Sequence, residues 1–246
     1  MTQSLVPDTT LPTEIPESRQ SAANALVSSL FSLSKRTVIV TGAGRGLGIV
    51  LAEAILESGG DVICLDILPA PSKDEWTRIE QAQKISGTYC SYHQCDITDE
   101  DTVTANLAEA AKAALKRGNP IRGLISCAGI QQMLDAIDYP LDGFRRILEV
   151  NVTGSFLIAK HTARILRDEG NSGSIVFIAS MSGQVANRYG IRVNTLSPGY
   201  IRTSMTDHLL AEKPEIEKLW MAGALLGRLG APEDFKAPAI YLLTDA

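Results

Sequence analysis

TGAGRGLG, residues 41–48, is the stretch of this sequence that decides the fold. It follows a short apolar run at residues 37–40 and opens a helical pattern at residues 47–57. Glycines let a backbone turn tightly and approach a pyrophosphate, while the N-terminus of the next helix offers free N–H groups and the positive end of its dipole. The spacing is Gly-x-x-x-Gly-x-Gly, not the common Gly-x-Gly-x-x-Gly, because Leu47 occupies the sixth place. The stretch alone is weak support for a dinucleotide, since a structural loop can share its composition.

Strand-like and helical patterns alternate after this point, as in βαβ units that form a parallel sheet. One helical pattern opens with Thr98-x-x-Asp101, which has the spacing of a capping box. The sequence therefore predicts one α/β domain at residues 35–246, a doubly wound parallel sheet of the Rossmann type. A flexible arm at residues 1–34 precedes it, whose residues 23–33 are apolar enough to pack on the domain edge. The strand-like runs are residues 37–40, 62–65, 89–95, 123–127, 174–179 and 191–197, and the helical runs are residues 47–57, 99–116, 144–168 and 232–243.

Composition and charge exclude several classes of partner. The chain has 246 residues, a net charge of −5 and a pI near 5.3, which disfavours nucleic acid because phosphate binding requires a basic face. No apolar run approaches the roughly 18 to 20 residues that span a bilayer, and residues 1–34 lack the basic start and apolar stretch of a secretory signal. Four cysteines without a C-x-x-C pair are typical of free thiols in a reducing compartment. We therefore expect a cytoplasmic protein with no nucleic-acid or membrane partner.

Two aspartates follow neighbouring predicted strands. Asp66 ends the second strand, where a carboxylate can accept hydrogen bonds from the adenosine ribose hydroxyls of a dinucleotide. Asp96 ends the third strand, within reach of an adenine edge. Either residue taken singly fits a plain turn at the end of a strand equally well. Together with the glycine-rich turn they occupy three successive strand ends, and this combination predicts a dinucleotide site.

The sequence resembles the short-chain dehydrogenase/reductase family from about residue 33 to the C-terminus. Residues 179–183 are similar to fungal polyol and sugar-ketone members, and Cys127 stands where the family usually has Asn. The resemblance implies NAD(P)-dependent hydride transfer between the nicotinamide and a secondary alcohol or ketone of polyol or ketose type. The matching pieces are residues 41–48, Cys127-Ala128-Gly129, Asn151-Val152, Ser180, Arg192-Val193-Asn194 and residues 198–203. The cofactor-binding residues that it implies are Gly42, Arg45, Gly46, Leu47, Gly48, Asp66, Asp96, Ile97, Ala128, Gly129, Asn151, Pro198, Gly199, Ile201 and Thr203.

The sequence favours NAD(H) over NADP(H) as the cofactor. Asp66 at the ribose would repel a 2′-phosphate. Arg45, just before the second motif glycine, occupies a position at which NADP(H)-dependent members of the family often have a basic residue. The negative charge of Asp66 at the ribose itself should affect the cofactor preference more than the positive charge of Arg45, which contacts the ribose only at its edge. We therefore expect NAD(H), with NADP(H) as the alternative.

The family's reaction needs four side chains. A Tyr passes the proton, a Lys four residues later lowers the pKa of that Tyr, a Ser hydrogen-bonds the carbonyl oxygen, and an Asn supports a water relay. By resemblance, Ser180 and Asn151 are the catalytic Ser and Asn. Ser182 is the competing choice for the serine, but Ser180 matches the family spacing to Gly183 better. Without the family match, Ser180 fits a strand-end cap and Asn151 fits a surface position on a helix.

The catalytic Tyr and Lys are missing. Tyr189 is the one tyrosine between the catalytic Ser and the sixth strand, the residue four positions later is Val193, and no lysine occurs at residues 184–202. Parallel strands need a crossover of a dozen or more residues, usually with a helix. Residues 181–190 span at most roughly 33 to 36 Å, which suffices to recross a strand but not to build a covering helix. We therefore expect that this crossover helix and the family's final strand are missing, and that the uncovered sheet face is unstable or sticky.

Two functions follow from the sequence. The first is an oxidoreductase of this family, whose full-length form carries the missing Tyr and Lys. The second is a catalytically inactive truncated or splice-variant chain that at most binds the dinucleotide, and we expect turnover near zero. The family's homo-oligomers form through the helix at residues 144–168 and the missing helix, which argues against the usual tetramer here. Residues 202–226 fit either the family's substrate lid or ordinary helix packing.

Overall fold

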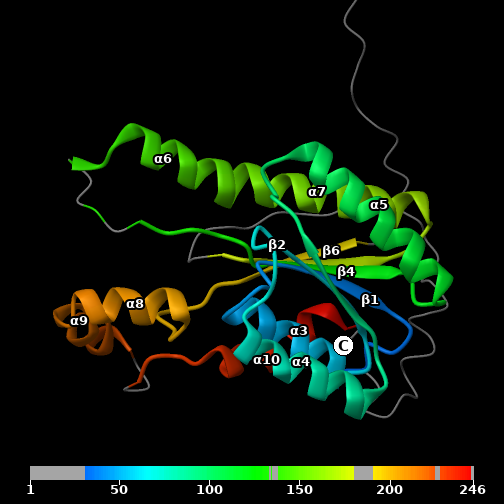
Figure 1. Cartoon of the computed structure of the whole chain (residues 1–246), viewed down its shortest axis with the longest axis horizontal. Helices are drawn as coiled ribbons and strands as arrows, with labels where there is room; N and C mark the ends of the chain where they lie inside the picture. Colours follow the sequence, from blue (N-terminus) through cyan, green and yellow to red (C-terminus); the bar gives the residue numbers. More distant parts are fainter. Residues whose placement is uncertain (1–30, 133, 135–137, 180–190, 225–227, 245–246) are drawn as a thin grey trace, which may run out of the picture.

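Six parallel strands form the sheet at the centre of the molecule, in the order β3-β2-β1-β4-β5-β6 (Figure 1). The computed structural model describes residues 31–132, 134, 138–179, 191–224 and 228–244. The order reverses direction at β1, because the chain first adds strands on one side of β1 and then on the other. The strands are β1 Thr37–Thr41, β2 Asp61–Asp66, β3 Cys90–Gln94, β4 Ile121–Ser126, β5 Gly173–Ile178 and β6 Ile191–Leu196.

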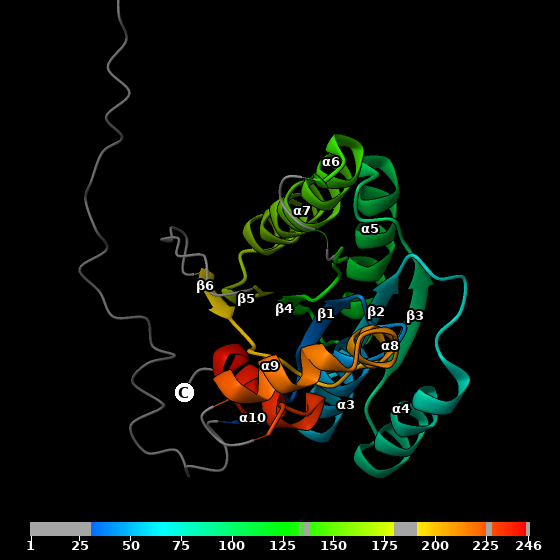
Figure 2. The ribbon, with the colours of Figure 1, turned by 90° about the vertical axis from the view of Figure 1, so that its left-hand side faces the viewer.

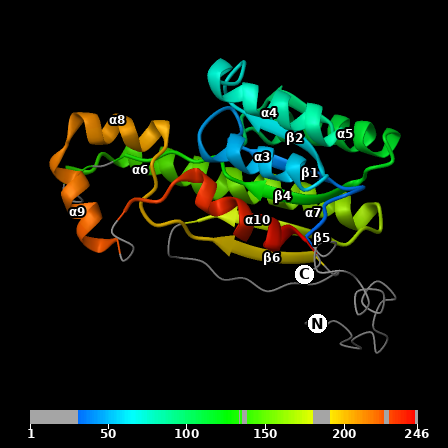
Figure 3. The ribbon, with the colours of Figure 1, turned by 90° about the horizontal axis from the view of Figure 1, so that it is seen from below.

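Helices cover both faces of the sheet (Figure 2). One face carries α3 Leu47–Glu57, α4 Lys73–Ser86 and α10 Lys236–Leu243, the last preceded by the short 3-10 helix η3 Pro232–Phe235. The other carries α5 Glu100–Lys116 and a long rod made of α6 Leu141–Leu148, the π-helix η2 Glu149–Gly154 and α7 Ser155–Asp168. The remaining helices, α8 Ser204–Glu212 and α9 Glu215–Gly223, lie beyond one end of the sheet (Figure 3).

Each layer of helices buries its own apolar cluster against the sheet. Side chains alternate between the two faces of a strand, so β1 sends Val38 and Val40 to the cluster under α3 and α10 and sends Ile39 to the cluster under α5 and α7. Every residue of β1 and β2 is buried. Parallel strands covered on both faces are expected to be apolar throughout, which explains why these two strands read as continuous apolar runs in the sequence.

The predicted fold class, a doubly wound parallel sheet in one domain, is confirmed. The helix predicted at residues 144–168 begins earlier, at Leu141, and contains the π-helix. Helix α4 was not predicted, because Ile79 and Ala82 are its only buried residues and the apolar period is too sparse to recognise. The capping-box prediction for α5 was wrong: Asp99, not Thr98, is the N-cap, and its carboxylate accepts the N–H of Asp101 at 3.0 Å and that of Thr102 at 3.3 Å.

Two of the predictions from the sequence fall partly or wholly on residues that the structure does not describe. Packing begins at Leu33, which is buried in the cluster under α3 and donates its N–H to the carbonyl of Ser58 at 2.8 Å. The rest of the predicted arm, residues 1–30, lies outside the described residues. The predicted absence of a crossover helix falls on residues 180–190, which are also outside them, while β6 pairs in parallel with β5 along its whole length. In the part of the chain that is described, no helix is long and apolar enough to cross a membrane.

Candidate functional site

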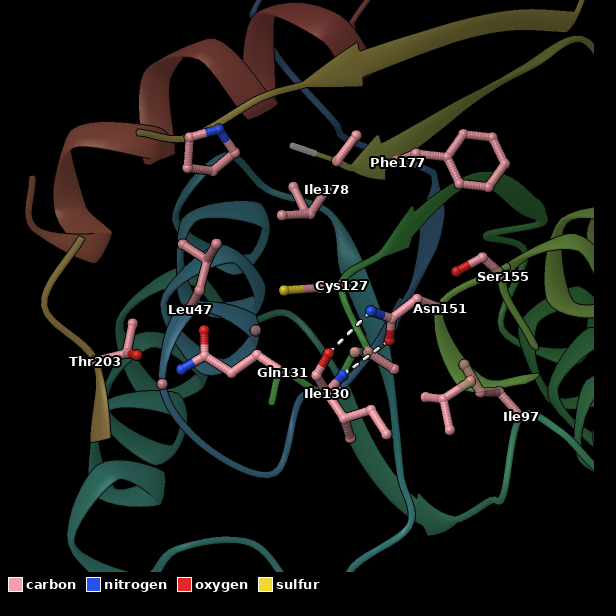
Figure 4. Close-up of a pocket in the computed structure, with 18 of the residues that line it drawn as sticks. Leu47, Ile97, Cys127, Ile130, Gln131, Asn151, Ser155, Phe177, Ile178 and Thr203 are labelled. Carbon is pink, nitrogen blue, oxygen red and sulfur yellow. Dashed lines mark hydrogen bonds between the residues drawn. The ribbon is translucent and has the colours of Figure 1, made fainter. Parts of the chain in front are cut away.

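A cavity of about 1320 Å³ opens where the carboxyl ends of the strands meet (Figure 4). Ligands of open α/β sheets bind in this crevice, at the point where the strand order reverses. All of the cofactor-binding residues implied by the sequence line this one cavity. They come from the glycine-rich turn after β1, the ends of β2 and β3, the segment after β4, the π-helix η2 and the segment after β6. The structure therefore brings together residues that lie as far apart in the chain as Gly42 and Thr203.

The glycine-rich turn needs its glycines because other backbone lies against them. Gly42 has a φ of +67°, and a Cβ on it would lie 2.7 Å from the Cα of Ala128. A Cβ on Gly48 would lie 2.1 Å from the carbonyl oxygen of Gly42. The hydroxyl of Thr41 accepts the N–H groups of Cys127 and Ala128, at 3.1 and 3.2 Å. These contacts fix the turn, the start of α3 and the segment after β4 as one rigid wall of the cavity.

The N-terminus of α3 faces the cavity without a side-chain cap. Its N-cap is Gly46, with a φ of +61°, and no acidic residue lies in the first turn. The first N–H groups of a helix have no partner within the helix, and with the helix dipole they favour an anion. Leu47 and Gly48 both line the cavity at this end. The arrangement can bind a phosphate group.

Asp66 is held as a fixed anion beside the glycine-rich turn. Its Oδ2 accepts the N–H of Gly44 at 2.7 Å, and its Oδ1 accepts the N–H of Leu68 at 3.0 Å. The side chain is buried, yet it lines the cavity. A carboxylate has about four acceptor positions, so two remain for hydroxyl donors from a ligand. Gly44 was not among the predicted site residues, although a Cβ there would lie 2.8 Å from the carboxyl of Asp66 and so exclude it.

Asp96 has a local partner as well as a place in the cavity. Its Oδ1 accepts the N–H of Thr98 at 2.9 Å and the hydroxyl of Thr98 at 2.7 Å. Asp96 therefore forms the local turn that the sequence allowed as one of its two possible roles. The residue also lines the cavity, and Oδ2 is not used by this turn. The next residue, Ile97, is buried under the π-helix, where a Cβ on Gly154 would lie 2.7 Å from its Cγ1. Gly154 lets the π-helix approach this wall closely.

Asn151 lies in the π-helix and ties it to the segment after β4. Its Oδ1 accepts the N–H of Ile130 and its Nδ2 donates to the carbonyl of Ile130, both at 2.9 Å (Figure 4). π-Helical turns within α-helices are frequent at functional sites. The sequence predicted a helical position for this residue but could not show that the amide makes a two-point contact with the backbone.

Cys127 points into the cavity between Leu47 and Asn151 (Figure 4). Burial raises the pKa of its thiol to about 12, with a smaller contribution from the charge of Asp66. The thiol is therefore protonated near neutral pH. Since the thiolate is the reactive form of cysteine, this residue contributes shape to the wall and no nucleophile.

The segment after β6 closes the cavity from the side of α8 and α9. Ile201 forms a parallel bridge with Gly230, and Thr203 caps α8 by accepting the N–H of Thr206 at 3.4 Å. The ring of Tyr200 stacks on that of Trp220, with centroids 4.4 Å apart and an angle of 8° between the planes. Leu210, Trp220 and Leu229 form a small apolar cluster of their own, with Leu209 and Ile216 packed against it. Ordinary helix packing therefore accounts for the apolar residues here, and the lid function remains a prediction.

The catalytic half of the prediction is only partly described. Ser180, Ser182 and Tyr189 lie outside the described residues. The cavity continues along the open face of β5 and β6, between these strands and α7. None of the residues that line it there was predicted as a site residue, because their types fit a buried core equally well. They are Ser155, Phe156, Ala159, Phe177, Val193 and Thr195.

Comparison with known proteins agrees with this arrangement. A family model described as short chain dehydrogenase matches residues 36–188, and one described as Enoyl-(Acyl carrier protein) reductase matches residues 184–246. The short chain dehydrogenase/reductase notP′ of Aspergillus versicolor is 40% identical over 250 residues, which cover 89% of this chain and 84% of that protein. The ribulose-forming D-arabinitol 2-dehydrogenase of Candida tropicalis is 29% identical, with 88% of each chain covered. The crystal structure of a short-chain type dehydrogenase/reductase from Mycobacterium marinum superposes with a TM-score of 0.76 at 31% identity, covering 89% of this chain and 92% of that one.

Proposed function

Because the chain belongs to the short-chain dehydrogenase family, we propose that its cavity binds a nicotinamide dinucleotide for hydride transfer between the nicotinamide and a secondary alcohol or ketone. One observation carries the proposal: every predicted cofactor-binding residue lines the same cavity. When bound, the dinucleotide supplies or accepts the hydride. The protein supplies binding and orientation, through the turn after β1, the carboxylates after β2 and β3, and the amide of Asn151.

The residues present fit a dinucleotide. The uncapped start of α3 offers N–H donors for the pyrophosphate. Gly42 and Gly48 allow a backbone approach that any Cβ would block. Asp66 has acceptor positions left for ribose hydroxyls, and Asp96 with Ile97 bounds the place expected for the adenine. These features together support a dinucleotide over an isolated phosphate.

The burial of Asp66 supports NAD(H) as the cofactor. A buried carboxylate held by two backbone N–H groups is a fixed negative charge that a 2′-phosphate would have to approach. The side chain of Arg45 is exposed, so water and salt screen its charge. For Asp66→Asn we expect the ratio of the NADPH to NADH dissociation constants to fall by about tenfold, about 1.4 kcal/mol.

A second function, dinucleotide binding without turnover, is favoured by the sequence itself. No tyrosine anywhere in the chain is followed by a lysine four residues later. Without that pair, no positioned side chain passes the proton as charge develops on the substrate oxygen, a contribution of about 10² to 10⁴ in rate. We expect this chain to bind the dinucleotide with turnover near zero. Sequencing the native transcript across the junction of residues 187 and 188 tests whether a parent form contains an added in-frame Tyr-x-x-x-Lys segment.

We expect the substrate class and the location to be those of the family, and the assembly to differ from it. A polyol or ketose is supported by the similarity to D-arabinitol 2-dehydrogenase. Four free thiols suit the reducing cytoplasm. The family's homo-oligomer uses a crossover helix for which residues 181–190 leave no room. We therefore expect light scattering of the purified chain to give a mass below that of a tetramer.

Calorimetric titration followed by a turnover assay tests both functions. The purified chain is titrated with NADH and with NADPH, then assayed with D-arabinitol and NAD and, in reverse, with D-ribulose and NADH. Tight binding with no change in the reduced nicotinamide absorbance supports binding without turnover. Robust turnover contradicts the inactive form, and failure to bind either dinucleotide contradicts both functions.

A further inference from the structure

Helix α4 places a second carboxylate on the glycine-rich turn. The Oε2 of Glu75 accepts the N–H of Gly46 at 2.6 Å, and Glu75 is half-buried in the first turn of α4. The start of α4 is docked on the same turn, because Ser72 donates its N–H to the carbonyl of Gly44 at 2.8 Å. Glu75 is thus held in place by backbone contacts of both segments.

Two carboxylates therefore hold amides that lie two residues apart. Asp66 takes the N–H of Gly44 and Glu75 takes the N–H of Gly46. Consecutive Cα atoms are 3.8 Å apart, so these two sites lie within about 8 Å of each other along the turn. Arg45 lies between them, with an exposed side chain that lines the cavity. The turn at this edge of the cavity therefore holds two carboxylates, with the exposed Arg45 between them. Asp66 and Arg45 line the cavity, whereas Glu75 contacts the turn without lining it.

The charge of Glu75 adds to that of Asp66 on the part of the turn proposed for the adenosine ribose, and it leaves the N–H groups of Leu47 and Gly48 at the start of α3 for the pyrophosphate. Gly46 is the N-cap of α3, and an N–H that already donates to a carboxylate offers less to a second anion. Negative side chains near a helix N-terminus are stabilised by the dipole, and Glu75 lies both in the first turn of α4 and against the N-cap of α3. A ligand with one more phosphate beside this turn would meet the carboxylate of Asp66 in the cavity and would be repelled by the charge of Glu75 through the turn.

We propose that Glu75 is a specificity-determining residue, which acts with Asp66 to reject the 2′-phosphate of NADP(H) by placing its charge on the Gly46 amide. This proposal rests on the proposed dinucleotide site. It assigns to α4, a helix outside the predicted site, a direct part in the choice of cofactor. Glutamine at this position keeps an acceptor for the Gly46 N–H and removes the charge, while alanine removes both.

Dissociation constants for NADH and NADPH, measured by calorimetry at low and high salt, test the proposal. For Glu75→Gln we expect NADPH to bind about tenfold more tightly and NADH to gain less than about threefold, with both gains shrinking at high salt because the effect is Coulombic. Glu80→Gln is the matched control. Glu80 lies on the same helix and is exposed. Its substitution by Gln removes the same charge at a position away from the turn.

The remaining outcomes separate this proposal from the proposed function. An unchanged NADPH to NADH ratio in Glu75→Gln, with the wild type binding NADH, overturns the role of Glu75 and leaves the dinucleotide site standing. An equal gain in Glu80→Gln also overturns it, since net charge alone would then be the cause. A wild type that binds neither dinucleotide while Glu75→Gln binds NADPH supports it. Glu75→Ala should lower the melting temperature of the free protein, and binding by no variant overturns both proposals.

Discussion

Asn151 uses both ends of its amide on the backbone of one residue, Ile130. Both hydrogen bonds are exposed, and each neutral hydrogen bond contributes about 1 kcal/mol. For Asn151→Ala we expect a loss of about 2 kcal/mol and a fall in melting temperature of about 4 to 8 °C. Dinucleotide affinity should fall with it, because Ile130 lines the cavity. Scanning calorimetry and NADH titration measure the two effects.

Asn106→Ala is the matched control for this substitution. The amide of Asn106 also bonds backbone carbonyls, those of Gln94 and Thr102, but it lies on α5 and does not line the cavity. Its loss should lower stability without changing the dissociation constant for NADH. Equal effects of the two variants on NADH binding would mean that Asn151 has no special place at the site.

Gly48 is expected to tolerate no side chain. A Cβ there would lie 2.1 Å from the Gly42 carbonyl oxygen, and this atom belongs to backbone that cannot move without shifting β1 and α3. Gly48→Ala should therefore cost several times more than Gly87→Ala, where φ is +69° but nothing lies within 4 Å. The strain at Gly87 is about 1 kcal/mol. Chemical denaturation compares the two, and equal costs would contradict the packing argument.

At the scale of single residues, the sequence predicts those that stand in a motif or at a strand end. Asp66 and Asp96 fall in this group because they stand at strand ends, and Leu47 because the family resemblance implies it. Gly44 and Glu75 could not be predicted. The role of Gly44 depends on a carboxyl of another strand, and that of Glu75 depends on the docking of a helix whose apolar period is too weak to recognise.

Three helices are joined at the scale of elements by the carboxylate of Glu53 on α3. It forms ion pairs with Lys236 of α10 at 2.7 Å and with Arg78 of α4 at 3.0 Å. Burial alone would raise the pKa of Glu53, but hydrogen bonds and charges from Lys236 and Arg78 bring it below its ordinary value of 4.5. Burial lowers the pKa of Lys236, and its bonds to Glu53 and Glu57 outweigh this and raise it above 10.5.

The contribution of this ion-pair group to stability should depend on pH with a defined sign. A carboxylate with a lowered folded-state pKa stabilises fully above its unfolded pKa and loses that contribution as the pH falls through the folded one. Lys236, with a raised pKa, stabilises below about 10.5 and loses its contribution at higher pH. Glu53→Gln should therefore lower the melting temperature near neutral pH and have a smaller effect at an acidic pH below 4.5, where Glu53 begins to lose its charge. Glu80→Gln should have little effect at either pH, and equal losses for Glu53→Gln at both would contradict the assignment.

Some helices and strands could be predicted from local sequence signals alone, and others could not. Strands β1 and β2 were recognisable because both faces are buried, and α3 because a glycine-rich turn begins it and Gly59 follows it. The π-helix could not be predicted, since residues 149–154 continue the pattern of the helices on either side. Its form depends on the contact of Gly154 with Ile97 and of Asn151 with Ile130, which join segments far apart in the chain.

At the scale of the whole molecule, the described residues include an exposed apolar stripe on the α6–η2–α7 rod. Phe144, Leu148, Val152 and Phe156, spaced four residues apart, have exposed fractions of 50%, 42%, 59% and 62%. Residues at this spacing share one face of a helix, and large exposed apolar patches are uncommon on a monomeric protein. The sequence predicted an unstable or sticky sheet face from the missing crossover helix, which stays a prediction, and it did not predict this stripe on the rod.

A double substitution in the stripe should reduce the binding of an apolar fluorescent dye. We expect Val152→Ser with Phe156→Ser to lower the dye signal of the folded protein by about half or more, since a contiguous patch binds such dyes and isolated residues do not. Ile85→Ser with Leu115→Ser is the control, because these residues are 87% and 51% exposed but lie apart on α4 and α5. Equal reductions in the two double variants would mean that the stripe is not the dye site.

The strand order also determines when the parts of the cavity can form while the chain is being synthesised. A polypeptide leaves the ribosome N-terminus first, so β1 can pair with β2 early, while its other neighbour, β4, emerges about 80 residues after β1. The hydroxyl of Thr41 gains its partners at Cys127 and Ala128 only then, and the wall at residues 198–203 comes still later. A nascent chain stalled before β4 therefore carries the complete glycine-rich turn and no pocket. We therefore expect translation intermediates of this protein to gain no stabilisation from the proposed dinucleotide until residues 198–203 have been synthesised.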